Sequence, residues 1–205
     1  MILSCNKECV KMKQKIERKP IRPIYPTPAG LVVSIDAKGK PNIITLGEIF
    51  NLSIRNPVWV GIAIHKARYS WGLIKEQGEF TVNMPTVAIV NKVQGCGSCS
   101  GRDGTDKFAK FKLTAQPAKY VKPPIIAECP INLECKVVGF HTVGDHDLFI
   151  GEVLLEHLDE DAANANGDRD ESKLNPLIWL GRGYYRLGEK VGEHRWQTDS
   201  GHVKS

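Results

Sequence analysis

Short apolar runs separated by turn residues constrain the fold of this chain more than any other feature. Two runs rich in β-branched residues, 31–35 and 43–46, flank the turn 37–41, which is typical of a β-hairpin. Further runs follow at 58–64, 79–83, 132–143, 148–158 and 177–180. Apart from the N-terminal segment, helical spacing occurs in three short segments, 70–77, 86–93 and 106–111. Because helices do not alternate regularly with strands, we expect a mainly β protein, an antiparallel barrel with short helical insertions.

The segments outside these runs are assigned by composition. A first helix is predicted over 4–18, and the prolines from Pro20 to Pro28 force an extended path after it. We interpret 47–57 as irregular, 94–104 as a loop rich in Gly, Ser and Cys, and 156–173 as a solvated acidic loop. The domain prediction is a basic N-terminal arm or helix over 1–21, one domain over 22–190, and a polar C-terminal tail over 191–205.

The charge is distributed unevenly along the chain. The formal net charge is 28 − 23 = +5, and residues 1–22 alone hold seven Lys or Arg and two Glu, which is 7 − 2 = +5. The remaining residues therefore sum to zero. A basic excess confined to one terminus argues against a folded domain that binds nucleic acid.

No apolar segment approaches the ~18 residues that a membrane-spanning helix needs. The first residues also lack the charge order of a secretory signal, since the lysines follow the apolar stretch. We therefore expect a cytoplasmic protein with no membrane partner, whose six cysteines are thiols.

Arg68 and Ser70 stand where a short helix is expected to begin. A helix start presents unpaired N–H groups and a positive dipole end, and an arginine beside it can bind phosphate in bidentate fashion. The alternative is a helix cap next to a surface arginine. Upstream, Asn42 and Thr45 could present polar groups to a ring system, with Ser53 further along, or could simply form the polar face of a strand.

Two further motifs leave alternatives open. Cys96 and Cys99 form a C-x-x-C motif. This motif could be half of a zinc site or a redox pair, or its cysteines could simply lie in a loop near a ligand. His146 lies in a tight turn between two strands, where it could donate a proton, stack on a substrate, or bond only to its neighbours. No G-x-G-x-x-G follows a strand, so no Rossmann domain is predicted.

In combination, these motifs resemble the flavin reductase-like, FMN-binding split-barrel family over about residues 22–190. The resemblance is carried by Pro41-Asn-Ile, Thr45, Ser53 and Asn56-Pro57, and by Arg68-x-Ser70 followed by Gly78-Glu-Phe-x-Val-Asn83. Two later stretches strengthen it: Ser100-Gly-Arg-Asp-Gly-Thr-Asp-Lys-Phe108, and the most specific motif, Gly144-Asp-His-Asp-Leu-Phe-Ile-Gly-Glu-Val153. Family members that release their flavin often carry an A-N-S-F-x-S motif after the first hairpin. Residues 43–48 of this chain do not match that motif, which favours the flavoredoxin-like branch.

The resemblance implies an antiparallel Greek-key split barrel that forms a homodimer and binds FMN near the subunit interface. It implies ring and ribityl contacts from residues 42–46, phosphate contacts at the helix start, and flavin contacts from 92–100. His146 would lie near the flavin face as the catalytic residue, and Lys92 would place a cation near the N1/C2 edge. The full set of implied FMN-binding residues is Thr27, Asn42, Ile43, Ile44, Thr45, Leu46, Ser53, Arg68, Tyr69, Ser70, Asn83, Lys92, Cys96 and Ser100, with no metal ligands.

The implied activity is an FMN-dependent oxidoreductase. Electrons would come from NAD(P)H or a reduced protein and would leave to a small-molecule or protein acceptor. Two alternatives remain: a non-enzymatic FMN-binding electron carrier or flavin store, and a protein that uses Cys96 and Cys99 for metal binding or redox sensing.

Overall fold

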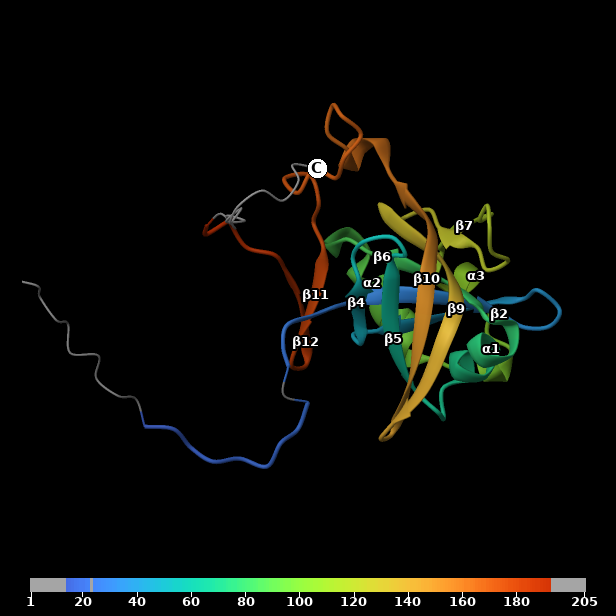
Figure 1. Cartoon of the computed structure of the whole chain (residues 1–205), viewed down its shortest axis with the longest axis horizontal. Coiled ribbons are helices and arrows are strands. Elements are labelled where there is room, and N and C mark those ends of the chain that lie inside the picture. Colours follow the sequence, from blue (N-terminus) through green and yellow to red (C-terminus); the bar gives the residue numbers. More distant parts are fainter. Residues whose placement is uncertain (1–13, 23, 193–205) are drawn as a thin grey trace, which may run out of the picture.

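A seven-stranded antiparallel sheet dominates the protein, whose computed structural model describes residues 14–22 and 24–192 (Figure 1). The strand order is β3-β2-β6-β9-β10-β5-β4. The strands are β2 (Gly30–Ile35), β3 (Pro41–Leu46), β4 (Ile49–Ser53), β5 (Trp59–His65), β6 (Glu79–Met84), β9 (Ile131–Val143) and β10 (His146–Leu158). Only Gly47 and Glu48 separate β3 from β4, although these strands lie at opposite edges of the sheet. The sheet therefore rolls up until its edges approach, which confirms the predicted split barrel.

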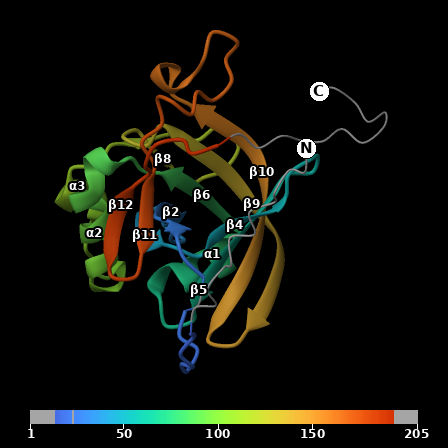
Figure 2. The same ribbon diagram turned by 90° about the vertical axis from the view of Figure 1, so that its left-hand side faces the viewer.

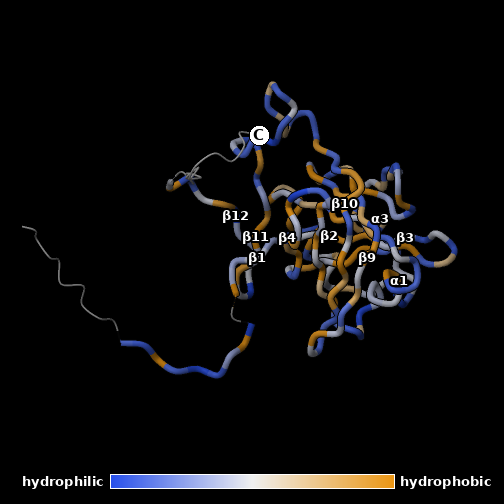
Figure 3. Tube along the Cα trace, viewed as in Figure 1, coloured by the Kyte–Doolittle hydropathy of each residue, from blue (hydrophilic) through white to orange (hydrophobic). Residues whose placement is uncertain are grey.

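Two hydrophobic clusters lie on the two faces of β2, and all six residues of this strand are buried. Leu31 and Val33 face the first cluster, which α2, α3 and β11 cover. Val32 faces the second cluster, inside the barrel, together with Phe80 and Phe149. Figure 3 shows the apolar residues concentrated in these strands. Burial on both faces explains why the run 31–35 shows no polar alternation.

Three α-helices of the described residues pack against the barrel: α1 (Tyr69–Gln77), α2 (Val90–Ser98) and α3 (Lys107–Phe111). Gly78 ends α1 in the left-handed region, at φ 69°, as a helix-ending glycine does. Thr86 caps the short 3-10 helix η1 (Val87–Ile89) that leads into α2, and Asp106 caps α3. Figure 2 shows α2 and α3 beside the small sheet that contains β11 and β12.

The smaller elements complete the chain. Strands β1 (Thr27–Pro28), β11 (Leu177–Leu180) and β12 (Gly183–Arg186) form one sheet, and β7 (Ala115–Gln116) pairs with β8 (Ile125–Ile126). The 3-10 helices η2 (Gly101–Asp103) and η3 (Glu160–Ala162) lie in the two long connections. No helix within the described residues is long and apolar enough to span a membrane.

Several local predictions were wrong. Segment 47–57 contains β4, which lies at the edge of the sheet and, among the described residues, pairs with β5 alone. Residues 183–186 had no predicted element, and they form β12 by pairing with β11. The predicted loop 94–104 begins as helix, because Gly95 lies against the Phe111 ring and Gly97 against Thr45, so close packing outweighs the low helix propensity of glycine. The predicted helix 4–18 lies largely outside the described residues, and 14–18 is not helical.

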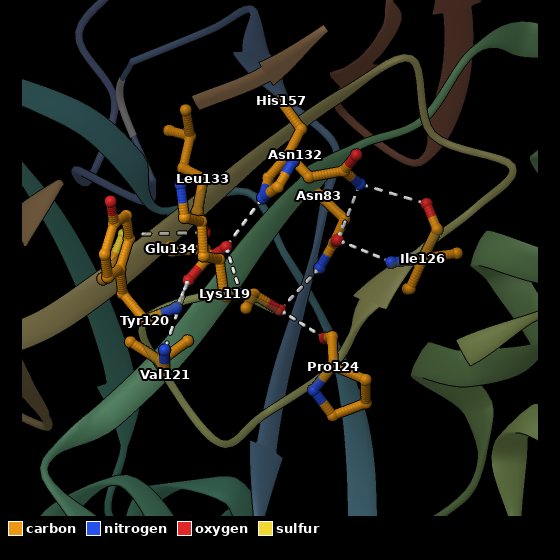
Figure 4. Close-up of polar contacts among 12 residues, drawn as sticks. Asn83, Lys119, Tyr120, Val121, Pro124, Ile126, Asn132, Leu133, Glu134 and His157 are labelled. Atoms are coloured by element: carbon orange, nitrogen blue, oxygen red, sulfur yellow. Dashed lines mark hydrogen bonds and ion pairs between the residues drawn. The ribbon is translucent and has the colours of Figure 1, made fainter. Parts of the chain in front are cut away.

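A buried polar network fastens the loop between β7 and β8 to the sheet (Figure 4). The fully buried Glu134 carboxylate on β9 accepts backbone N–H bonds from Lys119, Tyr120 and Val121, and the His157 ring lies 2.7 Å from it. Next to it, Asn83 bridges the backbone of Leu31 and Ile126 and the side chains of Thr81 and Asn132. Because buried polar groups need partners, this network specifies one placement of the loop.

Candidate functional site

A polar cavity of about 190 Å³ lies where β3 begins and α1 starts. One wall comes from the β2–β3 hairpin, one from the first residue of α1, and one from the segment 101–105. The residues that line it are Asp36, Lys40, Pro41, Asn42, Tyr69, Gly101, Arg102, Gly104 and Thr105. Ser70 touches the same site through Asn42. The structure therefore brings Asn42, Tyr69 and Ser70 together, as the sequence predicted for part of the site.

Asn42 carries an unused acceptor at this cavity. Its side-chain Nδ2 donates to Ser70 Oγ at 2.7 Å, and only 5% of the residue is exposed. Its Oδ1 is buried and has no partner among the described residues. Gly101 lies against this oxygen, since a Cβ on Gly101 would collide with it. A buried polar atom without a partner is costly, so the site favours a ligand that can donate a hydrogen bond to Asn42.

Two cations line the same cavity, and the N-terminus of α1 lies at its Tyr69 wall. Lys40 Nζ donates to the Gly104 carbonyl at 2.9 Å, and an Arg102 Nη donates to the Ala67 carbonyl at 3.2 Å. The exposed Arg68 is the N-cap residue of α1, whose first turn has no acidic residue and no side-chain cap bond. Asp36 is the one acidic residue among the lining residues. This arrangement suits an anion such as a phosphate.

The remaining side chains of β3 pack within the chain, although those of Ile44 and Thr45 are only half-buried. Thr45 Oγ1 donates to the Val93 carbonyl at 2.7 Å. Ile43 is fully buried in the first hydrophobic cluster. Leu46 is buried in the second cluster, and the half-buried Ile44 packs against that cluster. These side chains therefore pack within the chain, and the flavin contacts that the resemblance implied for 43–46 stay a prediction.

Asn83 and Lys92 are engaged elsewhere. The side-chain amide of Asn83 makes four hydrogen bonds in the interior network of Figure 4. It therefore has no free donor or acceptor for a cofactor. Lys92 Nζ donates to the Lys112 carbonyl at 2.6 Å and lies 3.6 Å from Glu128. These contacts turn Lys92 toward the end of α3 and Glu128, and none of these residues lines the polar cavity.

The remaining predicted residues are scattered. Ser53 Oγ donates to the Arg55 carbonyl, Ser100 Oγ accepts from the Arg102 N–H, and the buried Thr27 Oγ1 lies beside Gly47. His146 begins β10 at the tip of the β9–β10 hairpin, where its ring lies 2.8 Å from Asp145 and edge-on to His65. Its role as proton donor stays a prediction.

The cysteine motif has the properties of packing residues. Cys96 is buried on α2, and burial raises the pKa of its thiol to about 12. Cys99 is half-buried with its Sγ 3.6 Å from the Gly95 carbonyl, and both thiols are free. Within residues 14–22 and 24–192, no three His, Cys, Asp or Glu side chains gather in a way that could hold a metal ion.

A second, mostly apolar cavity of about 270 Å³ lies at the opposite end of the β2–β3 hairpin. Ile49, Val60, Val82, Met84 and Leu133 contribute to its walls, and the segment 174–176 closes one side. The sequence interpretation did not anticipate this cavity. It also missed Lys40, Arg102 and Thr105, although the glycines around Arg102 are the signal of a backbone that lies close to another element.

Comparisons with known proteins agree with the fold. Residues 22–188 match the model of the flavin reductase like domain. Flavoredoxin of Desulfovibrio vulgaris (Miyazaki F) is 31% identical in sequence, with a TM-score of 0.78 over 89% of this chain and 97% of the flavoredoxin. Flavoredoxin from Methanosarcina acetivorans is 30% identical, with a TM-score of 0.78 over 93% of this chain and 99% of that chain.

A third relative comes from the curated proteins. An uncharacterized protein of Archaeoglobus fulgidus is 43% identical over 131 residues, which are 64% of this chain and 72% of the relative. Together with the structural likeness, the domain match supports a flavin-related redox function. The chain belongs to the family of proteins that carry a flavin reductase like domain.

Proposed function

We propose that the protein binds FMN and passes electrons through it, from NAD(P)H or a reduced protein to an acceptor. The observation that carries this proposal is the polar cavity, which offers Lys40 and Arg102 to a phosphate and the unused Asn42 oxygen to a hydroxyl. Arg68 does not line the cavity, but it is the N-cap residue of α1 and directly precedes the lining residue Tyr69. This donor and acceptor set fits the phosphate and ribityl end of FMN. When bound, FMN supplies the redox chemistry, and the chain supplies position and charge.

The chain's own residues would act by binding and orientation. The two arginines and the helix start would fix the phosphate, and Asn42, itself held by Ser70, would fix the adjoining chain of hydroxyls. The cavity is smaller than the 300 Å³ or more that usually encloses a whole small ligand, so further walls are needed for the ring. We assign these walls to a second copy of the chain.

Purification tests the FMN proposal directly. We expect a yellow protein that releases FMN on heating, or a colourless one that regains a stoichiometric flavin spectrum with added FMN. Anaerobic addition of NADH and then NADPH should bleach the flavin if hydride transfer occurs. A protein that binds FMN but is not bleached by either nucleotide would instead be an electron carrier, the alternative that the likeness to flavoredoxins favours. A protein that cannot be loaded with FMN would contradict both.

Exposed apolar side chains support the proposed homodimer. Phe50 and Leu52 on β4, and Ile54 and Val58 in the following connection, are between 39% and 70% exposed. Adjacent exposed apolar residues on an edge strand are typical of an interface. Light scattering after size exclusion should give twice the 22.8 kDa mass of one chain, and Leu52→Asp should shift it toward one chain. A monomer at micromolar concentration would contradict the proposal.

A further inference from the structure

Lys107 is a buried cation behind the polar cavity. Only 4% of this residue is exposed, and its Nζ donates to the Ile43 carbonyl at 2.6 Å and to the Cys96 carbonyl at 2.7 Å. Ile43 directly follows Asn42 in one cavity wall, and Lys107 follows Thr105 of another wall by two residues. The ammonium group therefore joins the β3 wall to the segment 101–105, and it fastens both to the end of α2.

Both of the partners of Lys107 are neutral carbonyl groups. Among the described residues it forms no ion pair, although Asp103 is close enough to favour its charge. Burial lowers the pKa of the Lys107 ammonium, because a charged group loses solvation there, and the nearby Cys99, Cys96 and Asp103 oppose this effect. An apolar side chain of similar length would leave the Ile43 and Cys96 carbonyls without this donor, so hydrogen bonding explains a donor at this position. Neither carbonyl neutralises the charge, however, and a buried charge without a counter-ion costs free energy. Hydrogen bonding alone therefore does not explain a charged group here.

We propose that Lys107 is a positioning residue that makes the cavity selective for a phosphorylated flavin. Lys107 does not line the cavity itself: it ties the β3 wall to the segment 101–105 from behind, and its buried charge would favour an anion in the cavity. This inference rests on the proposed binding of FMN. Lys107 differs in its position from Lys92, whose partners lie away from the cavity and whose implied place near the N1/C2 edge of a flavin stays a prediction.

The test compares the dissociation constants of FMN and of riboflavin, which lacks the phosphate, for the full chain stripped of flavin. Quenching of flavin fluorescence measures both. For Lys107→Met we expect FMN affinity to fall by about tenfold or more, and riboflavin affinity by no more than about twofold, because only FMN carries the charge that the ammonium recognises. Lys107→Arg, which keeps the charge, should retain most of the preference for FMN. Lys110→Met, on the exposed face of the same helix, is the matched control and should change neither constant.

Every other outcome contradicts either the proposed selectivity of Lys107 or the proposed binding of FMN. Equal losses of FMN and riboflavin affinity would show that Lys107 only stabilises the fold. The same conclusion would follow if both Lys107→Met and Lys107→Gln failed to fold while Lys107→Arg folded. If the unaltered chain bound riboflavin and FMN equally well, flavin binding would stand and the selectivity would be overturned. If it bound neither flavin, the proposed function itself would fall, and this inference with it.

Discussion

Glu134→Gln is expected to lower the free energy of unfolding by about 3 kcal/mol or more, since removing one member of a buried charged network costs roughly 3–5 kcal/mol. The Glu134 carboxylate is fully buried and accepts three backbone N–H bonds of 2.6–3.2 Å. A glutamine would present an amide N–H₂ group to these donors, which leaves at least one of them without an acceptor. Urea unfolding followed by tryptophan fluorescence measures the loss.

Glu156→Gln is the matched control for this prediction. Glu156 lies on β10 and pairs with Arg169 at 2.7 Å, but both side chains are well exposed. An exposed ion pair contributes about 0–1 kcal/mol, so this variant should unfold close to the unaltered chain. If the two glutamine variants lost the same small amount of stability, the network of Figure 4 would not hold the loop as described.

The same carboxylate makes the stability depend on pH with a definite sign. Burial alone would raise the pKa of Glu134, but the N–H bonds from 119–121 and the contact with His157 outweigh it and hold the pKa below its ordinary 4.5. A group whose pKa is lower in the folded chain stabilises the fold above the unfolded pKa and loses this contribution as the pH falls through the folded pKa. The melting temperatures of the unaltered chain and of Glu134→Gln should therefore converge as the pH falls below about 4.5.

Much of the barrel could be predicted from sequence because its strands carry strong local signals. The β2–β3 hairpin combines β-branched runs with a turn glycine at φ 81°, and Gly78 and Thr86 mark helix boundaries by chemistry that depends only on neighbours. Strand β4 lacked such a signal, because Phe50 and Leu52 remain exposed at the edge of the sheet. Its existence depends on pairing with β5, which a local pattern does not reveal.

The site was harder to predict than the fold for a related reason. The start of α1 near Arg68 and Ser70 could be predicted because helical spacing is a local pattern. The cavity itself needs segments far apart in the chain, as in the bond from Lys40 to the carbonyl of Gly104, 64 residues away. Asn83 illustrates the opposite difficulty. A polar residue near a strand end resembles a ligand-binding residue in the sequence, but the Asn83 side chain instead forms hydrogen bonds with buried backbone groups.

The double variant Arg68→Met/Arg102→Met is expected to lower FMN affinity by about 100-fold or more. Each charged hydrogen bond to a phosphate contributes about 1.5–3 kcal/mol. Arg102 lines the cavity and Arg68 is the N-cap residue of α1, and a guanidinium group can bind a phosphate through two parallel hydrogen bonds. Each single variant should lose part of this affinity. Riboflavin binding should change much less, because it has no phosphate.

Arg182→Met/Arg186→Met is the control for this variant, because both of these arginines are exposed on the small sheet of β11 and β12. The same two fluorescence titrations, together with melting temperatures, separate the possibilities. If the Arg68/Arg102 variant bound FMN as tightly as the unaltered chain at a normal melting temperature, the phosphate would lie outside the polar cavity. The apolar cavity at the other end of the β2–β3 hairpin would then be the better candidate for the flavin, and Met84 would be the residue to replace next.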